Sequence, residues 1–116
     1  MINIKVDEAY AFDMLSVLDI KKKNSSTDKY NFDTMCNDIK KEVGPTLFEK
    51  IMNSNLYFEM VKVNKTIYDL IEVIRKGVIK LDATVIDDAN TERFKIKRKL
   101  QSEFIFNELV ENKTQI

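Results

Sequence analysis

Glycine and proline are the residues that most restrict the fold of this chain, because it has very few of them. Two glycines and one proline occur in 116 residues. Proteins with many short strands need many turns, and turns rely on glycine and proline for their backbone geometry. Their scarcity therefore predicts long helices and few loops. With 44% hydrophobic residues, the chain can build a core, and its length fits one domain over residues 1–116.

Apolar residues recur every three or four positions along most of the sequence, which is the spacing of one helix face. The pattern predicts four long helices and a short one: 8–23, 28–42, 47–52, 55–76, and 82 or 84 to about 107. Alternation of Ile2, Ile4 and Val6 predicts a short strand or extended arm over 1–6, and residues 109–116 are expected to fray. The predicted fold is an all-α antiparallel bundle of four to five helices.

The segment 55–76 has the strongest helical pattern. Two apolar rows run along it, one through Leu56, Met60, Val63, Ile67, Leu70 and Ile74, the other through Tyr57, Val61, Asn64, Tyr68 and Ile71. Together they form a stripe wider than a surface helix needs. We therefore interpret this segment as the central helix of the bundle, contacted on more than one side.

The charge balance argues against a dedicated nucleic-acid-binding protein. Nineteen basic residues balance nineteen acidic ones, whereas nucleic-acid binders usually carry a basic excess that neutralises phosphates. Two basic clusters, Lys21–Lys23 and Lys95–Lys99, could still form a local patch. Consecutive helical residues fan out by about 100° each, so neither cluster forms one stripe. Nucleic-acid binding through a local basic patch is therefore a weaker alternative.

Several residue types that carry catalytic chemistry are missing. The chain has no histidine and one cysteine, Cys36, so the commonest general base, zinc ligands and an internal disulfide are missing. Two separated glycines cannot form a phosphate-binding loop. Carboxylates could hold magnesium, but Asp13 and Asp19 do not share a helix face. We assign no catalytic residue and expect no metal and no cofactor, which makes an enzyme the less favoured class.

The sequence also indicates where the protein resides. It contains no apolar run of the roughly 20 residues that span a membrane. Its first residues, MINIKVDEAY, lack the basic and then apolar segments of a secretory signal. We therefore expect a cytoplasmic protein without membrane contact.

Three polar residues occupy positions where the helical rows predict apolar ones: Asn64, Asn90 and Arg93. A buried arginine or asparagine is costly unless it has a partner, and Asp13, in the middle of the first predicted helix, is the natural one. Two interpretations follow. The residues form a satisfied polar cluster that fixes the register of the helices, or they line a small cleft in which Arg93 binds an anion as a bidentate donor.

Four stretches carry a resemblance to a family: EAYAFDMLSVLDIKKKN, NKTIYDLIEVIR, DDANTERFKIKRKLQ and FNELVENKTQI. They resemble small uncharacterised all-helical proteins from bacterial and marine phage genomes, with an ILEIK-like first helix and an Asn–Asp–x–Arg–x–x–x–Lys-like last helix. If the chain is phage-encoded, the cytoplasm would be that of the host. The resemblance implies a helical fold and a polar site, and no activity. Its site residues would be Asp13, Asp19, Lys21, Asn64, Asn90, Arg93 and Lys97.

This sequence departs from the family pattern in two places. Met14 replaces a lysine that commonly follows the acid, and Thr91 stands where an acid follows Asn90. Both changes weaken a charged site.

Two functional hypotheses remain. The first is a non-catalytic helical protein that self-associates as a homodimer, because aromatic residues such as Phe58, Phe94 and Phe106 cannot all be buried in a chain of this size. The second is a binding protein or enzyme that takes a small anionic ligand such as a nucleotide or sugar phosphate. It would use Asp13, Asn64, Arg93 and Lys97, and it predicts a concave pocket where these side chains converge.

Overall fold

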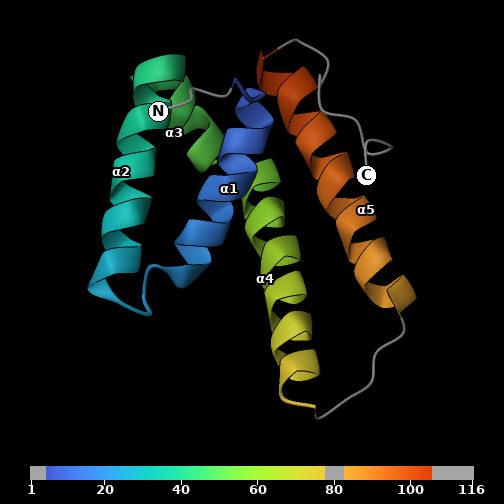
Figure 1. Cartoon of the computed structure of the whole chain (residues 1–116). Helices are drawn as coiled ribbons and strands as arrows, with labels where there is room; N and C mark the ends of the chain where they lie inside the picture. Colours follow the sequence, from blue (N-terminus) through green and yellow to red (C-terminus); the bar gives the residue numbers. More distant parts are fainter. Residues whose placement is uncertain (1–4, 78–82, 106–116) are drawn as a thin grey trace.

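The computed structural model describes residues 5–77 and 83–105, and this part of the chain is an all-α bundle without strands, as predicted (Figure 1). The helices are α1 (Glu8–Lys21), α2 (Ser26–Val43), α3 (Pro45–Met52), α4 (Asn55–Arg75) and α5 (Ala83–Leu100), which continues into one π-helical turn, η1 (Gln101–Ile105). Of the predicted N-terminal arm only Lys5 and Val6 are described, and neither lies in a helix or strand. The tail predicted to fray lies outside the described residues.

The helix boundaries follow from local capping. Ser25 accepts a hydrogen bond from the backbone N–H of Asp28 at the start of α2, and Ser54 accepts one from Tyr57 at the start of α4. Gly44 separates α2 from α3 with φ of 90°, and Pro45 occupies the first turn of α3. These residues explain why short connections suffice between the first four helices.

Helix α4 is contacted on more than one side, as predicted, and α1 shares this central position. Helix α1 contacts α2, α4, α5 and η1, and α4 contacts α1, α3 and α5. The Phe12 ring of α1 lies 6.0 Å from the ring of Phe48 and 6.5 Å from that of Tyr57, so side chains from α1, α3 and α4 meet there. The buried residues of α1 include polar Asp13 and Ser16. These two polar residues interrupt the apolar spacing of its buried face, and the neighbouring Met14 is 43% exposed.

Helices α4 and α5 pack side by side as an antiparallel hairpin whose lower end in Figure 1 extends past α1. The buried residues of α4 are Tyr57, Met60 and Asn64, all in its first half, and those of α5 lie from Ile96 onward. We call residues 67–75 of α4 and 84–90 of α5 the distal hairpin. None of these residues is buried.

Candidate functional site

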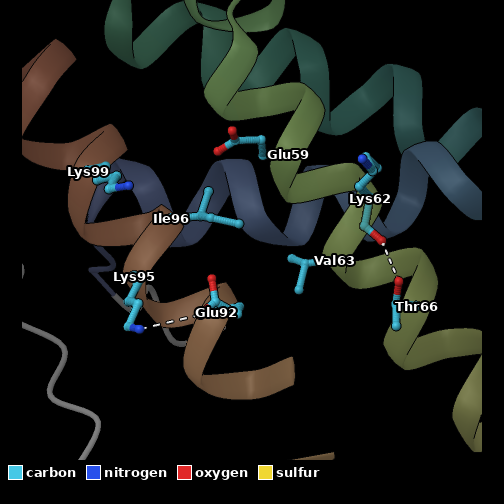
Figure 2. Close-up of a pocket in the computed structure, with 8 residues that line it drawn as sticks. All are labelled: Glu59, Lys62, Val63, Thr66, Glu92, Lys95, Ile96 and Lys99. Carbon is cyan, nitrogen blue, oxygen red and sulfur yellow. Dashed lines mark hydrogen bonds and ion pairs between the residues drawn. The ribbon is translucent and has the colours of Figure 1, made fainter. Parts of the chain in front are cut away.

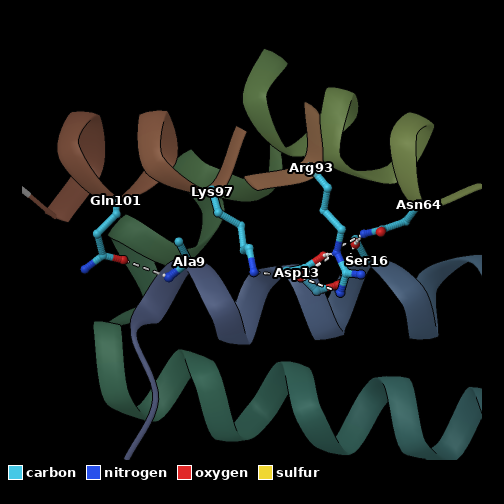
Figure 3. Close-up of polar contacts among 7 residues, drawn as sticks. All are labelled: Ala9, Asp13, Ser16, Asn64, Arg93, Lys97 and Gln101. Carbon is cyan, nitrogen blue, oxygen red and sulfur yellow. Dashed lines mark hydrogen bonds and ion pairs between the residues drawn. The ribbon is translucent and has the colours of Figure 1, made fainter. Parts of the chain in front are cut away.

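A buried ion cluster joins α1, α4 and α5, and consists of Asp13, Ser16, Asn64, Arg93 and Lys97 (Figure 3). The Asp13 carboxylate is fully buried. Arg93 places Nε 2.9 Å from both carboxylate oxygens and Nη2 2.7 Å from Oδ2, and Lys97 Nζ lies 3.6 Å from Oδ2. Asn64 Nδ2 donates to Asp13 Oδ1 and to Ser16 Oγ, both at 2.7 Å. The Ser16 hydroxyl donates to the Asp13 carbonyl at 2.6 Å.

The electrostatics of this cluster explain how a carboxylate can lie in the core. An unpaired buried charge is strongly destabilising, but a charge with close counter-ions and hydrogen bonds is tolerated. Both oxygens of Asp13 are occupied by donors from α4 and α5. The geometry therefore fixes the positions of three helices relative to one another, and leaves the carboxylate little room to bind a ligand.

The structure brings together four of the residues that the resemblance implies: Asp13, Asn64, Arg93 and Lys97. The pairing of Arg93 with Asp13, predicted from the helical rows, is present. The other three do not join them. Asn90 is exposed on α5, and Lys21 at the end of α1 is not a partner of Asp13 in the described part of the chain.

Asp19 belongs to a separate contact between α1 and α4. It accepts a hydrogen bond from the Tyr57 hydroxyl at 2.9 Å and forms an ion pair with Lys22 at 2.8 Å. Burial, followed by the charge of Asp19 and this hydrogen bond, raises the pKa of Tyr57 far above its ordinary value. Tyr57 therefore remains a protonated donor at any physiological pH.

Sequence reasoning missed two members of this polar layer, Ser16 and Gln101. Gln101 is almost fully buried; its Oε1 accepts the backbone N–H of Ala9 at 2.9 Å, and its Nε2 lies 3.3 Å from Glu8. It thus satisfies a free N–H in the first turn of α1. Spacing along the helix could have indicated Gln101. It follows Arg93 and Lys97 at intervals of four residues, so the three side chains lie on one face, as Figure 3 shows.

Two of the surface cavities that described residues form lie away from the ion cluster. A groove of about 390 Å³ between α4 and α5 has Val63 and Ile96 on its floor, with charged residues such as Lys95 and Glu92 around it (Figure 2). A second cavity of about 440 Å³ lies beside Asp19 and Phe58. The pocket predicted at the converging polar residues is thus not one of these two.

The part of the chain that the structure describes contains no group of three acidic or cysteine side chains arranged to hold a metal ion. No helix within residues 5–77 and 83–105 is long and apolar enough to cross a membrane. Cys36 is half-buried, and burial raises the pKa of its thiol, with the charges of Asp33 and Asp19 contributing. A raised pKa disfavours the reactive thiolate.

Exposed apolar side chains form the second candidate site. Phe58 is 64% exposed, as predicted, while Phe94 is half-buried and Phe106 lies outside the described residues. On the distal hairpin, the side chains of Ile71, Ile74 and Val85 are 39%, 40% and 41% exposed. They are accompanied there by half-buried apolar residues: Ile67, Leu70, Val73 and Ile86.

Comparisons with known proteins do not assign the chain to a family. No family model matches it, and neither a curated protein nor a solved structure matches it either. The resemblance to phage and bacterial helical proteins therefore stays a prediction.

Proposed function

We propose that this chain is a non-catalytic helical protein that works by self-association, most simply as a two-fold dimer. The observation that carries the proposal is the distal hairpin. Apolar residues of two helices lie there, and none of them is buried. Contiguous exposed apolar surface commonly marks a protein interface. Two-fold dimers are the commonest closed assemblies of identical chains.

Removal of apolar side chains from water would drive this association. Each square ångström of apolar surface removed from water stabilises the buried state by roughly 25 cal/mol. Within the described part of the chain the distal hairpin gains only part of this stabilisation, because its isoleucines, leucine and valines are exposed or half-buried. A partner that covers both helices would complete the burial that the single chain leaves unfinished.

The buried ion cluster supports a structural role for its residues rather than a catalytic one. Its carboxylate is fully buried and its oxygens are occupied by three side chains from α4 and α5. A polar group in such surroundings can specify one packing arrangement among several. In this proposal the cluster holds the hairpin at a fixed angle to α1, so that the apolar surface is presented in one orientation.

Light scattering coupled to gel filtration tests the proposal directly. The chain has a mass of 13.6 kDa, so a dimer would appear at about 27 kDa, twice that value. We expect the dimer to dominate at roughly 100 μM, a concentration that detects even weak association. A particle of 13.6 kDa over the whole range up to that concentration would refute self-association.

A small anionic ligand is the second candidate, and the position of Arg93 favours it. Nε and Nη2 of this guanidinium bind Asp13, and the side chain remains 30% exposed. Its Nη1 donors could therefore meet a phosphate group. A thermal-shift measurement with ATP and with a sugar phosphate tests this, because a ligand of the native state must raise the unfolding temperature. No shift at millimolar concentrations would rule out binding of these two ligands.

A further inference from the structure

We infer that two copies of the chain associate through their distal hairpins, with α4 of one copy lying against α5 of the other, to form a four-helix bundle. This inference rests on the proposed self-association and specifies its surface and orientation. The exposed side chains belong to both helices: Ile71 and Ile74 to α4, and Val85 to α5. A partner that presents two helices covers such a surface better than a single segment does, and an isologous dimer supplies the same two helices.

The last described turn of the chain lies far from this surface. Ile105 ends η1, which follows Leu100 at the end of α5 remote from the distal hairpin (Figure 1). The 15 residues that follow Asn90, up to Ile105, rise by about 22 Å, at 1.5 Å per helical residue. Within the described residues, η1 therefore does not cover the distal hairpin.

Charge complementarity favours a second copy and fixes which helices meet. At the connected end of the hairpin α4 ends at Arg75, with Lys76 as its C-cap, and α5 carries Asp87 and Asp88. These aspartates are exposed and form no ion pair with any residue the structure describes, while Arg75 reaches only Glu72, at 3.9 Å. When α4 lies against the partner's α5, the basic end of α4 meets the acidic start of the partner's α5. The two-fold symmetry produces this contact twice. These contacts form when the connected ends of the two hairpins lie together; in that orientation, α4 against the partner's α4 would bring like charges together.

The apolar part of the interface is tested with Ile71→Lys/Ile74→Lys. Both side chains are partly exposed in one chain and lie near the C-terminus of α4, where added positive charge suits the helix dipole, so the monomer should fold. We expect the dimer dissociation constant to rise at least about 100-fold, because buried unpaired charge opposes association strongly. Tyr30→Lys/Asn37→Lys is the matched control: it adds the same two positive charges at exposed positions of α2, outside the distal hairpin, and should leave the dissociation constant within about twofold.

The orientation is tested with two charge-reversed variants, Asp87→Lys/Asp88→Lys and Arg75→Glu/Lys76→Glu. Each variant alone places like charges together at both symmetry-related contacts, so its dimer should weaken about tenfold relative to the wild type. An equimolar mixture of the two variants places opposite charges together at both contacts. We expect the mixture to recover dimerisation to near the wild-type dissociation constant, with the difference reduced at high salt.

The outcomes separate the inference from the proposed function. If the wild-type chain stays monomeric, both the proposed self-association and the distal-hairpin interface are refuted. A wild-type dimer that the two isoleucine replacements leave unchanged keeps self-association and overturns the distal hairpin as its surface. A dimer that depends on the isoleucines but is not weakened by either charge reversal overturns the orientation. Circular dichroism of every variant should match the wild-type helix content, and hydrogen exchange should protect α4 and α5 at the distal hairpin in the dimer alone.

Discussion

Arg93 of α5 holds the fully buried carboxylate of Asp13 in α1 through Nε and Nη2, across a separation of 80 residues in sequence. This contact brings the chain's last helix to its first. Since Asn64 of α4 donates to the same carboxylate, one aspartate fixes three helices. The arrangement gives the bundle a polar contact that only one register satisfies.

Replacing Asp13 by Asn should be strongly destabilising. The change leaves the Arg93 and Lys97 cations facing a neutral group, and loss of one partner from a buried ion pair costs about 3–5 kcal/mol of unfolding free energy. Urea denaturation followed by circular dichroism measures this. Asp33→Asn is the control, because the Asp33–Lys29 pair is exposed and should contribute less than about 0.5 kcal/mol. Equal effects of the two replacements would show that the cluster does not stabilise the fold.

Asn64→Ala tests the amide in the same cluster. The replacement removes the donor to Asp13 and Ser16 and leaves both oxygens with fewer partners in a buried place. We expect a loss of about 1–3 kcal/mol in unfolding free energy, the usual cost of leaving buried polar groups unsatisfied. Asn37→Ala on the exposed surface of α2 is the matched control and should change stability by less than about 0.5 kcal/mol. A smaller effect at Asn64 than at Asn37 would contradict the role assigned to the amide.

The helices were predictable from sequence for a physical reason. Scarce glycine and proline mark the few breaks, and the helical periodicity fills the segments between them. The central position of α1 was not predictable in the same way. Its buried face includes Asp13 and Ser16, and a periodicity argument counts polar residues as exposed. Identifying the core helix would have required knowing that partners for these groups arrive from α4 and α5.

The ion cluster was predictable in part. Asn64 and Arg93 stand on rows that are otherwise apolar, so a buried polar contact followed from spacing alone. Asn90 was predicted from the same spacing, but it is exposed on α5, so that prediction was wrong. Asp19 and Lys21 came from the resemblance, which names residues without giving their positions in space, and the structure places them outside the cluster. Tyr57 was read only as an apolar row member, because nothing in the sequence shows that its hydroxyl reaches Asp19.

Gly44→Ala should destabilise the protein through the backbone. Gly44 has φ of 90° and ψ of 152°, a conformation that residues with a Cβ rarely adopt, and a Cβ there would meet no atom within 4 Å. The cost is therefore conformational, about 1–3 kcal/mol. Gly77→Ala, at φ of 67°, enters the left-handed helical region and should cost about 1–2 kcal/mol. Chemical denaturation of the two variants should show the larger loss at Gly44, and a stability gain there would contradict this backbone geometry.

The hydrogen bond between Tyr57 and Asp19 should make stability fall at alkaline pH. Burial raises the pKa of Tyr57 in the folded state above its ordinary value of 10.0. Above pH 10 the unfolded tyrosine releases its proton while the folded one retains it, so the unfolded state gains stability as pH rises. The loss from this residue amounts to about 1.4 kcal/mol by pH 11, from the standard linkage relation.

Tyr57→Phe isolates that effect. At pH 8 the variant should lose about 1 kcal/mol, because the hydrogen bond to Asp19 is missing. Between pH 9 and pH 11 its unfolding free energy should fall less steeply than that of the wild type, by about the 1.4 kcal/mol assigned to the phenol. Urea denaturation at each pH measures both curves. Parallel curves would show that Tyr57 ionises with the same pKa in the folded and unfolded states, and the buried contact with Asp19 would then not exist in solution.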